Sequence, residues 1–134
     1  MVILFDEFHL PESIYEIVFA TEQQVIVAKL LIDEMKRNHG TWGKTEMSFF
    51  ANKLHEGVTF ETEKQEGFVK KREKINISYN KRQFYDRILT PMKSMGMIDY
   101  DMFKKQYIIS DKFNKALMKI GLLWVHELQK PIHQ

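Results

Sequence analysis

Residues 21–37 predict a helix that is apolar on nearly every side, and this feature constrains the fold more than any other. Thr21 is a residue type that caps helices, Glu22 follows in the first turn, and Gly40 lies just beyond the expected end. The apolar side chains are Val25, Ile26, Val27, Ala28, Leu30, Leu31, Ile32 and Met35. Such a helix has to be covered on several sides, so we expect it in the middle of the fold.

The chain has 134 residues, 44% of them hydrophobic, which fits a single domain over 1–134 with a proper core. It has no cysteine, which excludes disulfides and thiolate metal sites and favours a cytoplasmic protein. No apolar run approaches the roughly 20 residues of a membrane span, so no membrane partner is expected. The run at 1–5 has no basic residue before it, so it does not predict a signal peptide.

Two further helices and a short strand are predicted in the first half. A strand is expected at 2–5 and a helix after Pro11, both within an N-terminal extension at 1–20. Another helix begins at Thr45 and is closed by Gly57. The side chains expected to be buried are Ile14, Ile17 and Val18 in the first helix and Phe49, Phe50 and Leu54 in the second.

The segment 57–78 is a charged insertion whose structure the sequence leaves open. Alternation in 58–62 and 75–79 is compatible with a hairpin, and a mobile loop is compatible with the crowded charges. From Lys64 to Arg87 there are eight bases and three acids, a balance of +5 in a chain whose net charge is +2. This concentration indicates either a polyanion-binding surface or an ordinary solvated loop.

After Asn80 the helical period returns. Phe84, Ile88, Met92 and Met95 recur at steps of three and four residues, so one face is expected in the core. Pro91 should kink this helix, because proline lacks a backbone donor. Gly96 should end it, and the runs 97–100 and 106–110 then predict a β-hairpin.

The last helix, at 111–129 and capped by Asp111, carries two apolar stripes. Phe113, Leu117, Ile120, Trp124 and Leu128 form the first stripe, and Met118, Leu122 and Val125 form the second. We expect the first to pack on the chain's own core. The second predicts a homodimer interface in a two-fold dimer, unless the N-terminal helix covers it within one chain.

The segments RQFYDRILTPMKSMGMIDYD and KKQYIIS resemble winged helix-turn-helix transcription regulators, in which a recognition helix ends in glycine and an apolar pair opens the wing. The resemblance implies an α+β fold, mainly α with a small β-hairpin, with extra N- and C-terminal helices. The recognition helix and wing would occupy 79–110. One departure is the distance between the helix at 45–54 and the helix after Asn80. This implies either an insertion or a further helix at 66–75.

The resemblance implies a dimeric, prokaryotic transcriptional regulator that places helix 81–95 in the major groove of double-stranded DNA, with wing 99–110 flanking. Such a protein would be nucleoid-associated. Arginine and glutamine side chains fit base edges, whereas lysine and tyrosine side chains fit phosphates. The expected contacts are Tyr79, Lys81, Arg82, Gln83, Tyr85, Arg87, Lys93, Lys104 and Lys105, with Lys70, Lys71 and Arg72 as possible additions. Tyr79 and Tyr85 could instead be core aromatics.

An enzyme is not expected. The five histidines show no metal-ligand spacing, and there is no phosphate-binding glycine loop or nucleophile motif, so no metal and no cofactor is predicted. The alternative function is a winged-helix module for protein–protein contact without DNA binding. It would use the acidic N-terminal segment and the second stripe of the last helix.

Overall fold

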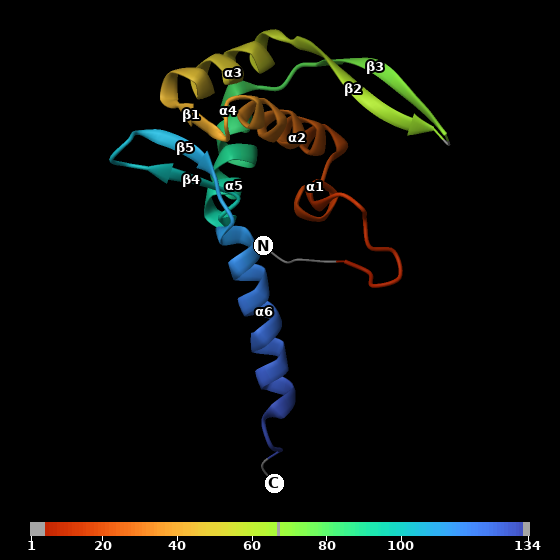
Figure 1. The fold of residues 1–134 in the computed structure, drawn as a ribbon, viewed down its shortest axis with the longest axis vertical. Coiled ribbons are helices and arrows are strands. Elements are labelled where there is room, and N and C mark those ends of the chain that lie inside the picture. The colour runs from red at the N-terminus through yellow and green to blue at the C-terminus, as the bar shows by residue number, and fades with distance from the viewer. Residues whose placement is uncertain (1–4, 67, 133–134) are drawn as a thin grey trace.

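The computed structural model describes residues 5–66 and 68–132, and it is built mainly of helices with two small antiparallel sheets (Figure 1). Mixed α and β structure of this kind is compatible with the α+β class expected from sequence. In chain order the elements are α1 (Ile14–Val18), α2 (Glu22–Arg37), β1 (Thr41–Gly43), α3 (Lys44–Glu56), β2 (Val58–Glu66), β3 (Val69–Ile77), α4 (Lys81–Phe84), the π-helical turn η1 (Tyr85–Leu89), α5 (Thr90–Met95), β4 (Ile98–Asp101), β5 (Gln106–Ile109) and α6 (Lys112–Gln129). The strand expected at 2–5 falls almost wholly outside the described residues.

Helix α2 is the centre of the core, as its apolar surface predicts. Its buried side chains are Val27, Ala28, Leu30, Leu31, Ile32 and Met35. Around it, the rings of Trp42, Phe50 and Phe84 make a chain of contacts, with centroids 5.4 and 5.5 Å apart. Three helical segments from distant parts of the sequence therefore share one core.

The expected helix boundaries are confirmed where a cap defines them. Thr21 Oγ1 accepts a hydrogen bond from the Gln24 backbone N–H at 3.2 Å, so α2 starts at the next residue. Helix α3 begins one residue before Thr45 and ends at Gly57, whose φ of +100° suits glycine.

The expectation that Phe49 is buried is wrong, because its side chain is 61% exposed. The buried positions of α3 are Met47, Phe50, Ala51 and Leu54, which follow a period of three and four residues. Phe49 is out of phase with this face and points away from the core.

The three-stranded sheet has the order β1–β5–β4. The sequence predicts the hairpin β4–β5 but not β1, because three residues that end in a glycine carry no alternating pattern. Trp42 in β1 pairs with Tyr107 in β5, and Tyr107 also pairs with Tyr100 in β4. Strand β1 thereby ties the hairpin to the start of α3.

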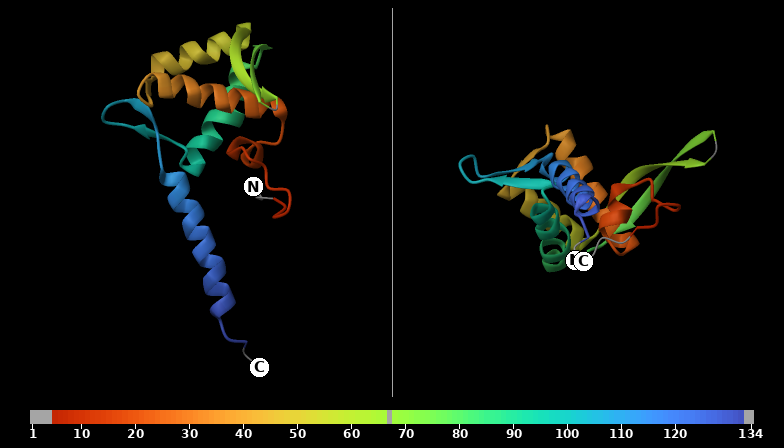
Figure 2. Two further views of the ribbon diagram at one scale, coloured as in Figure 1. Left: turned by 45° about the vertical axis from the view of Figure 1, so that its right-hand side comes forward. Right: turned by 90° about the horizontal axis from the view of Figure 1, so that it is seen from below.

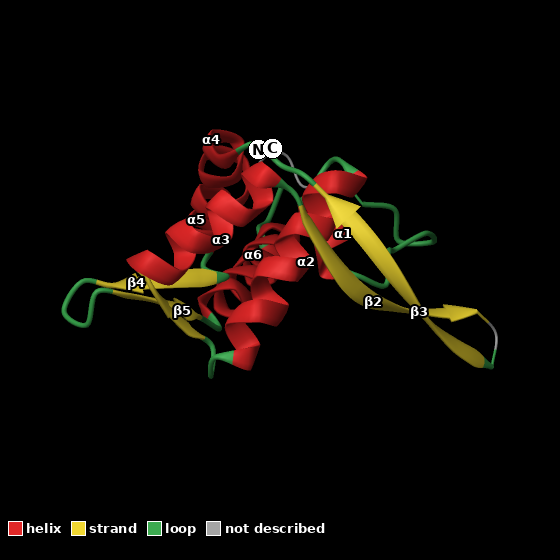
Figure 3. Cartoon of the chain, turned by 90° about the horizontal axis from the view of Figure 1, so that it is seen from above, coloured by secondary structure: helices red, strands yellow, loops and turns green. Residues whose placement is uncertain are grey.

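The charged insertion is a second hairpin, so the loop alternative and the alternative helix at 66–75 are both wrong. Strands β2 and β3 have nine residues each and pair from Val58–Ile77 to Glu66–Val69. The two hairpins extend from opposite sides of the helices (Figure 3).

Helix α6 projects away from the rest of the chain (Figures 1 and 2). Its base is fixed at Gly96, whose carbonyl accepts a hydrogen bond from the Phe113 N–H at 3.0 Å, and by an ion pair between Lys112 and Asp99 at 2.6 Å. None of its side chains is buried. The expectation that its first stripe packs on the chain's own core is therefore wrong beyond Phe113, and the N-terminal helix does not cover the second stripe either.

Candidate nucleic-acid interface

The helical segment 81–95 starts at a fixed point. Asn80 Oδ1 accepts a hydrogen bond from the Gln83 N–H at 3.1 Å, which satisfies a donor of the first turn. The Lys81 N–H meets Nδ1 of His55 at 3.2 Å, so the end of α3 holds the beginning of α4. The sequence predicts no ligand role for His55, and in the structure its ring contacts the backbone.

The expected kink at Pro91 takes the form of a widened turn. Residues Tyr85–Leu89 form a π-helical turn, and the Thr90 N–H bonds to the Tyr85 carbonyl. A proline ring collides with the carbonyl four residues earlier, and a wider turn relieves that collision. The helix continues to Met95 and ends at Gly96, which has a φ of +84°.

One side of this segment is packed and the other is open. Phe84, Ile88, Leu89 and Met92 are buried, while Arg82, Gln83, Arg87 and Lys93 are exposed. Among the expected contacts, Lys81 and Tyr85 are half-buried. Tyr79 lies in the core at 5% exposure, in agreement with the core-aromatic alternative, so its ring is not part of an open surface.

The exposed charges of the helix are mostly positive. Arg82 Nε lies 3.8 Å from Asp86 Oδ2, one turn along, and both side chains are exposed. Among the side chains that the structure describes, no carboxylate forms an ion pair with Arg87, Lys104 or Lys105. Asp86 thus offsets Arg82 only in part, because solvent screens an exposed pair.

A cluster of lysines and tyrosines joins this helix to the hairpin β4–β5. The rings of Tyr100 and Tyr107 lie 4.9 Å apart, centroid to centroid. Lys93 Nζ lies 5.8 Å from each ring centroid, and Lys44 Nζ, at the start of α3, lies 5.3 Å from that of Tyr100. We call these four residues the Lys–Tyr cluster. It brings two ammonium groups from different helices to one pair of rings.

Within this cluster, the phenol of Tyr107 is partly buried. Its burial, with Tyr85 and Tyr100 nearby, raises the pKa of Tyr107 above its ordinary value. Tyr107 is therefore a neutral hydroxyl at physiological pH, and it can donate a hydrogen bond to an anion.

The sequence-based prediction missed Lys44, Tyr100 and Tyr107. A signal for the tyrosines exists, because they are cross-strand partners in the register of the predicted hairpin. For Lys44 there is none, since only the pairing of β1 with β5 brings the start of α3 to the hairpin.

The tip of the hairpin β4–β5 is held by one carboxylate. Asp101 Oδ1 accepts hydrogen bonds from the backbone N–H groups of Phe103 and Lys104, at 2.9 and 3.1 Å. Lys105 takes a positive φ of 54°, which closes the turn. The fully exposed Phe103 ring therefore stands beside two exposed lysines.

The three possible additional contacts are on the other hairpin. Lys70, Lys71 and Arg72 belong to β3 by their backbone pairing, while their side chains lie outside the described residues. Figure 3 shows this hairpin directed away from β4–β5. The structure therefore does not bring these three positions together with the Lys–Tyr cluster.

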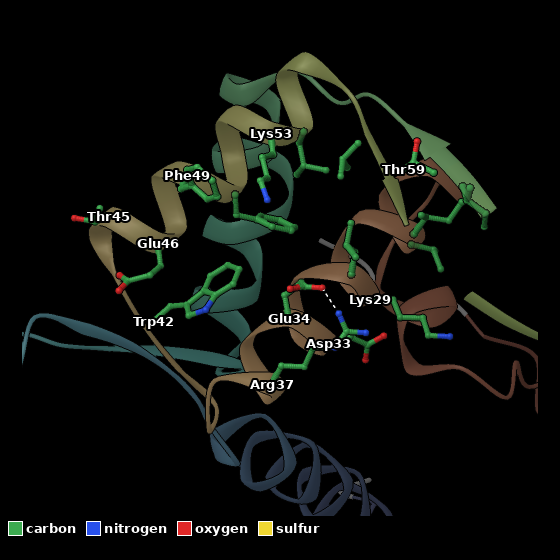
Figure 4. Close-up of a pocket in the computed structure, with 17 residues that line it drawn as sticks. Lys29, Asp33, Glu34, Arg37, Trp42, Thr45, Glu46, Phe49, Lys53 and Thr59 are labelled. Carbon is green, nitrogen blue, oxygen red and sulfur yellow. Dashed lines mark hydrogen bonds and ion pairs between the residues drawn. The ribbon is translucent and has the colours of Figure 1, made fainter. Parts of the chain in front are cut away.

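A separate open groove of about 1310 Å³ lies between α2 and α3, with the segment 81–95 behind it (Figure 4). Its floor includes Leu30, Trp42 and Phe50, and charges of both signs line its rim. Lys53 Nζ lies 4.6 Å from the ring centroid of the exposed Phe49. This lining suits an apolar group better than a polyanion.

Comparison with known proteins gives no family: no family model, no curated protein and no solved structure matches this chain. Where the structure describes side chains, no group of three or more metal-ligating residues comes together. Over residues 5–66 and 68–132, no helix has the length and apolarity needed to cross a membrane.

Proposed function

We propose that the protein binds double-stranded DNA as a winged-helix regulator, with helix 81–95 in the major groove and the hairpin 99–110 beside it. The observation that carries this proposal is the Lys–Tyr cluster. It brings the ammonium groups of Lys93, on the helix, and Lys44, at the start of α3, to the rings of the hairpin β4–β5, and Arg87 adds an exposed positive charge on the same helix. Phosphates on either side of a groove require donors arranged in this way.

The order of the elements supports the same proposal. Helices α2 and α3 pack against the segment 81–95, and a β-hairpin follows it directly. The helix that would enter the groove packs against the core through Phe84, Ile88 and Met92, which are fully buried. In this arrangement Arg82, Gln83 and Arg87 face base edges, while Lys44, Lys93, Lys104 and Lys105 meet phosphates.

The test is fluorescence anisotropy with a labelled random-sequence duplex across a salt series. The Arg82→Ala/Arg87→Ala variant removes two donors from the helix. We expect binding to weaken by about 1–3 kcal/mol for each arginine that no longer reaches the DNA. A second variant, Lys104→Ala/Lys105→Ala, removes two of the proposed phosphate contacts, and it should make the slope of log affinity against log salt shallower by about 0.9 for each phosphate that is no longer neutralised.

The matched control is Lys29→Ala/Arg37→Ala, which also removes two positive charges but at the groove between α2 and α3. This control should bind DNA nearly as the wild type does. If this control and the Arg82→Ala/Arg87→Ala variant lose the same amount of DNA affinity, the DNA is attracted by the overall charge of the protein and not by the surface of helix 81–95. No binding of the wild type at low salt would refute the proposal.

A module for protein–protein contact is the second candidate. It rests on the apolar side chains left exposed in the N-terminal segment and on α6, among them Phe5 at 62%, Phe8 at 83% and Trp124 at 63%. It also predicts no DNA affinity for the helix 81–95, so the salt series separates the two candidates.

A further inference from the structure

Helix α6 exposes a broad apolar face. Seven large apolar side chains on it are between 39 and 70% exposed: Leu117, Met118, Ile120, Leu122, Trp124, Val125 and Leu128. When successive residues are placed 100° apart around the helix axis, this face covers an arc of roughly 200°, with Ile120 at one edge and Leu122 at the other. The polar residues within this arc are Asn114 and Gln129. The opposite strip carries Lys112, Lys115, Lys119, Leu123 and His126.

Gly121 lies at the centre of this face, both along the helix axis and around it. Nine residues of α6 precede it and eight follow, and its direction lies near the middle of the apolar arc. A Cβ built at Gly121 would meet no atom within 4 Å, so nothing in its own chain requires a glycine there. Glycine destabilises a helix interior relative to alanine, which calls for a compensating contact from outside the chain.

We propose that α6 pairs with α6 of a second copy, antiparallel and crossing at Gly121, so that both stripes contribute to one interface. A missing side chain at the crossing point lets the two backbones approach closely. A residue that precedes Gly121 in one copy then lies at the same height along the axis as the residue that follows Gly121 by the same number of positions in the second copy. Leu117 therefore lies at the height of the second copy's Val125. Both are apolar, which is what a continuous interface needs.

The helix dipole favours antiparallel over parallel pairing. Two parallel helices would set equal partial charges beside each other at both ends, whereas in the antiparallel pair each end lies beside the opposite end of the second copy's helix. The lysines of α6 do not decide the direction, because Lys112, Lys115 and Lys119 lie on the strip that faces away from the second copy.

The exposed area sets an upper limit that reaches the size of a stable interface. When the lower value for an aromatic side chain, roughly 150 Å², is taken for each of the seven, their exposed fractions give at most roughly 600 Å² per copy. The pair would then bury at most roughly 1,200 Å², the lower end of stable interfaces.

The first test is sedimentation equilibrium of the whole chain, with no DNA present, so its outcome is independent of the proposed function. The wild type should form dimers. Gly121→Leu should weaken association about tenfold or more, equivalent to ~1.4 kcal/mol, because the side chain separates the helices. Ala116→Leu, which adds the same side chain to α6 well away from the centre of the apolar face, is the control and should leave association unchanged.

Single cysteines test the direction of pairing, because the chain has none of its own. In the antiparallel pair the two copies of position 117 are about 12 Å apart along the axis, too far for a disulfide. A mixture of Leu117→Cys and Val125→Cys should therefore form mixed disulfide dimers, and Leu117→Cys alone should not. A monomeric wild type, a Gly121→Leu variant that associates normally, or crosslinking of Leu117→Cys with itself would overturn the proposal.

Discussion

Helices α2 and α6 have similar lengths and similar apolar content, and yet they differ completely in surroundings. In α2, six side chains are buried by the chain itself, whereas in α6 none is. An apolar helix therefore indicates only that a cover is needed. Whether that cover comes from the same chain or from another molecule depends on where the chain directs the helix after its last contact with the core.

The largest expected effect is on the free energy of unfolding, which should depend on protein concentration for a substitution in α6 but not for one in α2. Met35→Ala in α2 removes a fully buried side chain and should lower the free energy of unfolding by about 2–5 kcal/mol, at every protein concentration. Leu122→Ala in α6 should lower it only where copies associate, because association stabilises by mass action. Urea unfolding at low and high protein concentration measures both. An equal and concentration-independent decrease in Leu122→Ala would remove the distinction.

A smaller effect is expected at the joint between the two regions. Gly96 has a φ of +84°, and a Cβ there would lie 2.9 Å from Lys112 Cβ and from the Phe113 nitrogen. Gly96→Ala should therefore cost about 1–3 kcal/mol and displace the base of α6. Gly121→Ala is the matched substitution without such contacts, and in dilute protein it should stabilise the helix by about 0.8–1.0 kcal/mol. Thermal unfolding of the two variants should move in opposite directions.

The smallest effect concerns the ion pair at the same joint. The hydrogen bond from Lys112, with that from the Tyr100 N–H and the charge of Lys93, lowers the pKa of Asp99 below its ordinary value. Because this pKa is lower in the folded than in the unfolded chain, the contact stabilises the fold above the unfolded pKa. That stabilisation is lost as the pH falls through the folded pKa.

Lys112→Met should raise the pKa of Asp99 back toward its ordinary value, and an NMR titration of the Asp99 carboxyl measures it. Lys115→Met, which removes a lysine paired with Asp111 instead, is the control. An Asp99 pKa that is unchanged in Lys112→Met would show that the charge of Lys93 and the backbone dominate.

Local signals explain which features the sequence predicts well. Thr21, Gly57 and Gly96 define helix ends by their own conformations and hydrogen bonds, which involve residues a few positions away. The buried face of segment 81–95 follows from a period of three and four residues. Such features need no knowledge of distant contacts, so the sequence alone contains them.

The remaining features depend on pairings between distant residues. The strand at Thr41–Gly43 exists because β5 lies beside it, and Lys44 reaches the hairpin for the same reason. The prediction for Phe49 is wrong because two adjacent phenylalanines leave the phase of the buried face ambiguous. For α6 both stripes are real, and only the direction of the helix decides that neither meets the core.

The hairpin β2–β3 begins and ends at one place. The chain leaves α3 at Gly57, and at its return the Tyr79 N–H donates to the Leu54 carbonyl at 2.8 Å. Ile77, at the base of the hairpin, is buried in the core, whereas the junction of α3 and α4 closes through its own hydrogen bonds. The hairpin beyond its base is therefore a permissive insertion point, where a longer hairpin or a grafted reporter leaves the helix 81–95 in the same position.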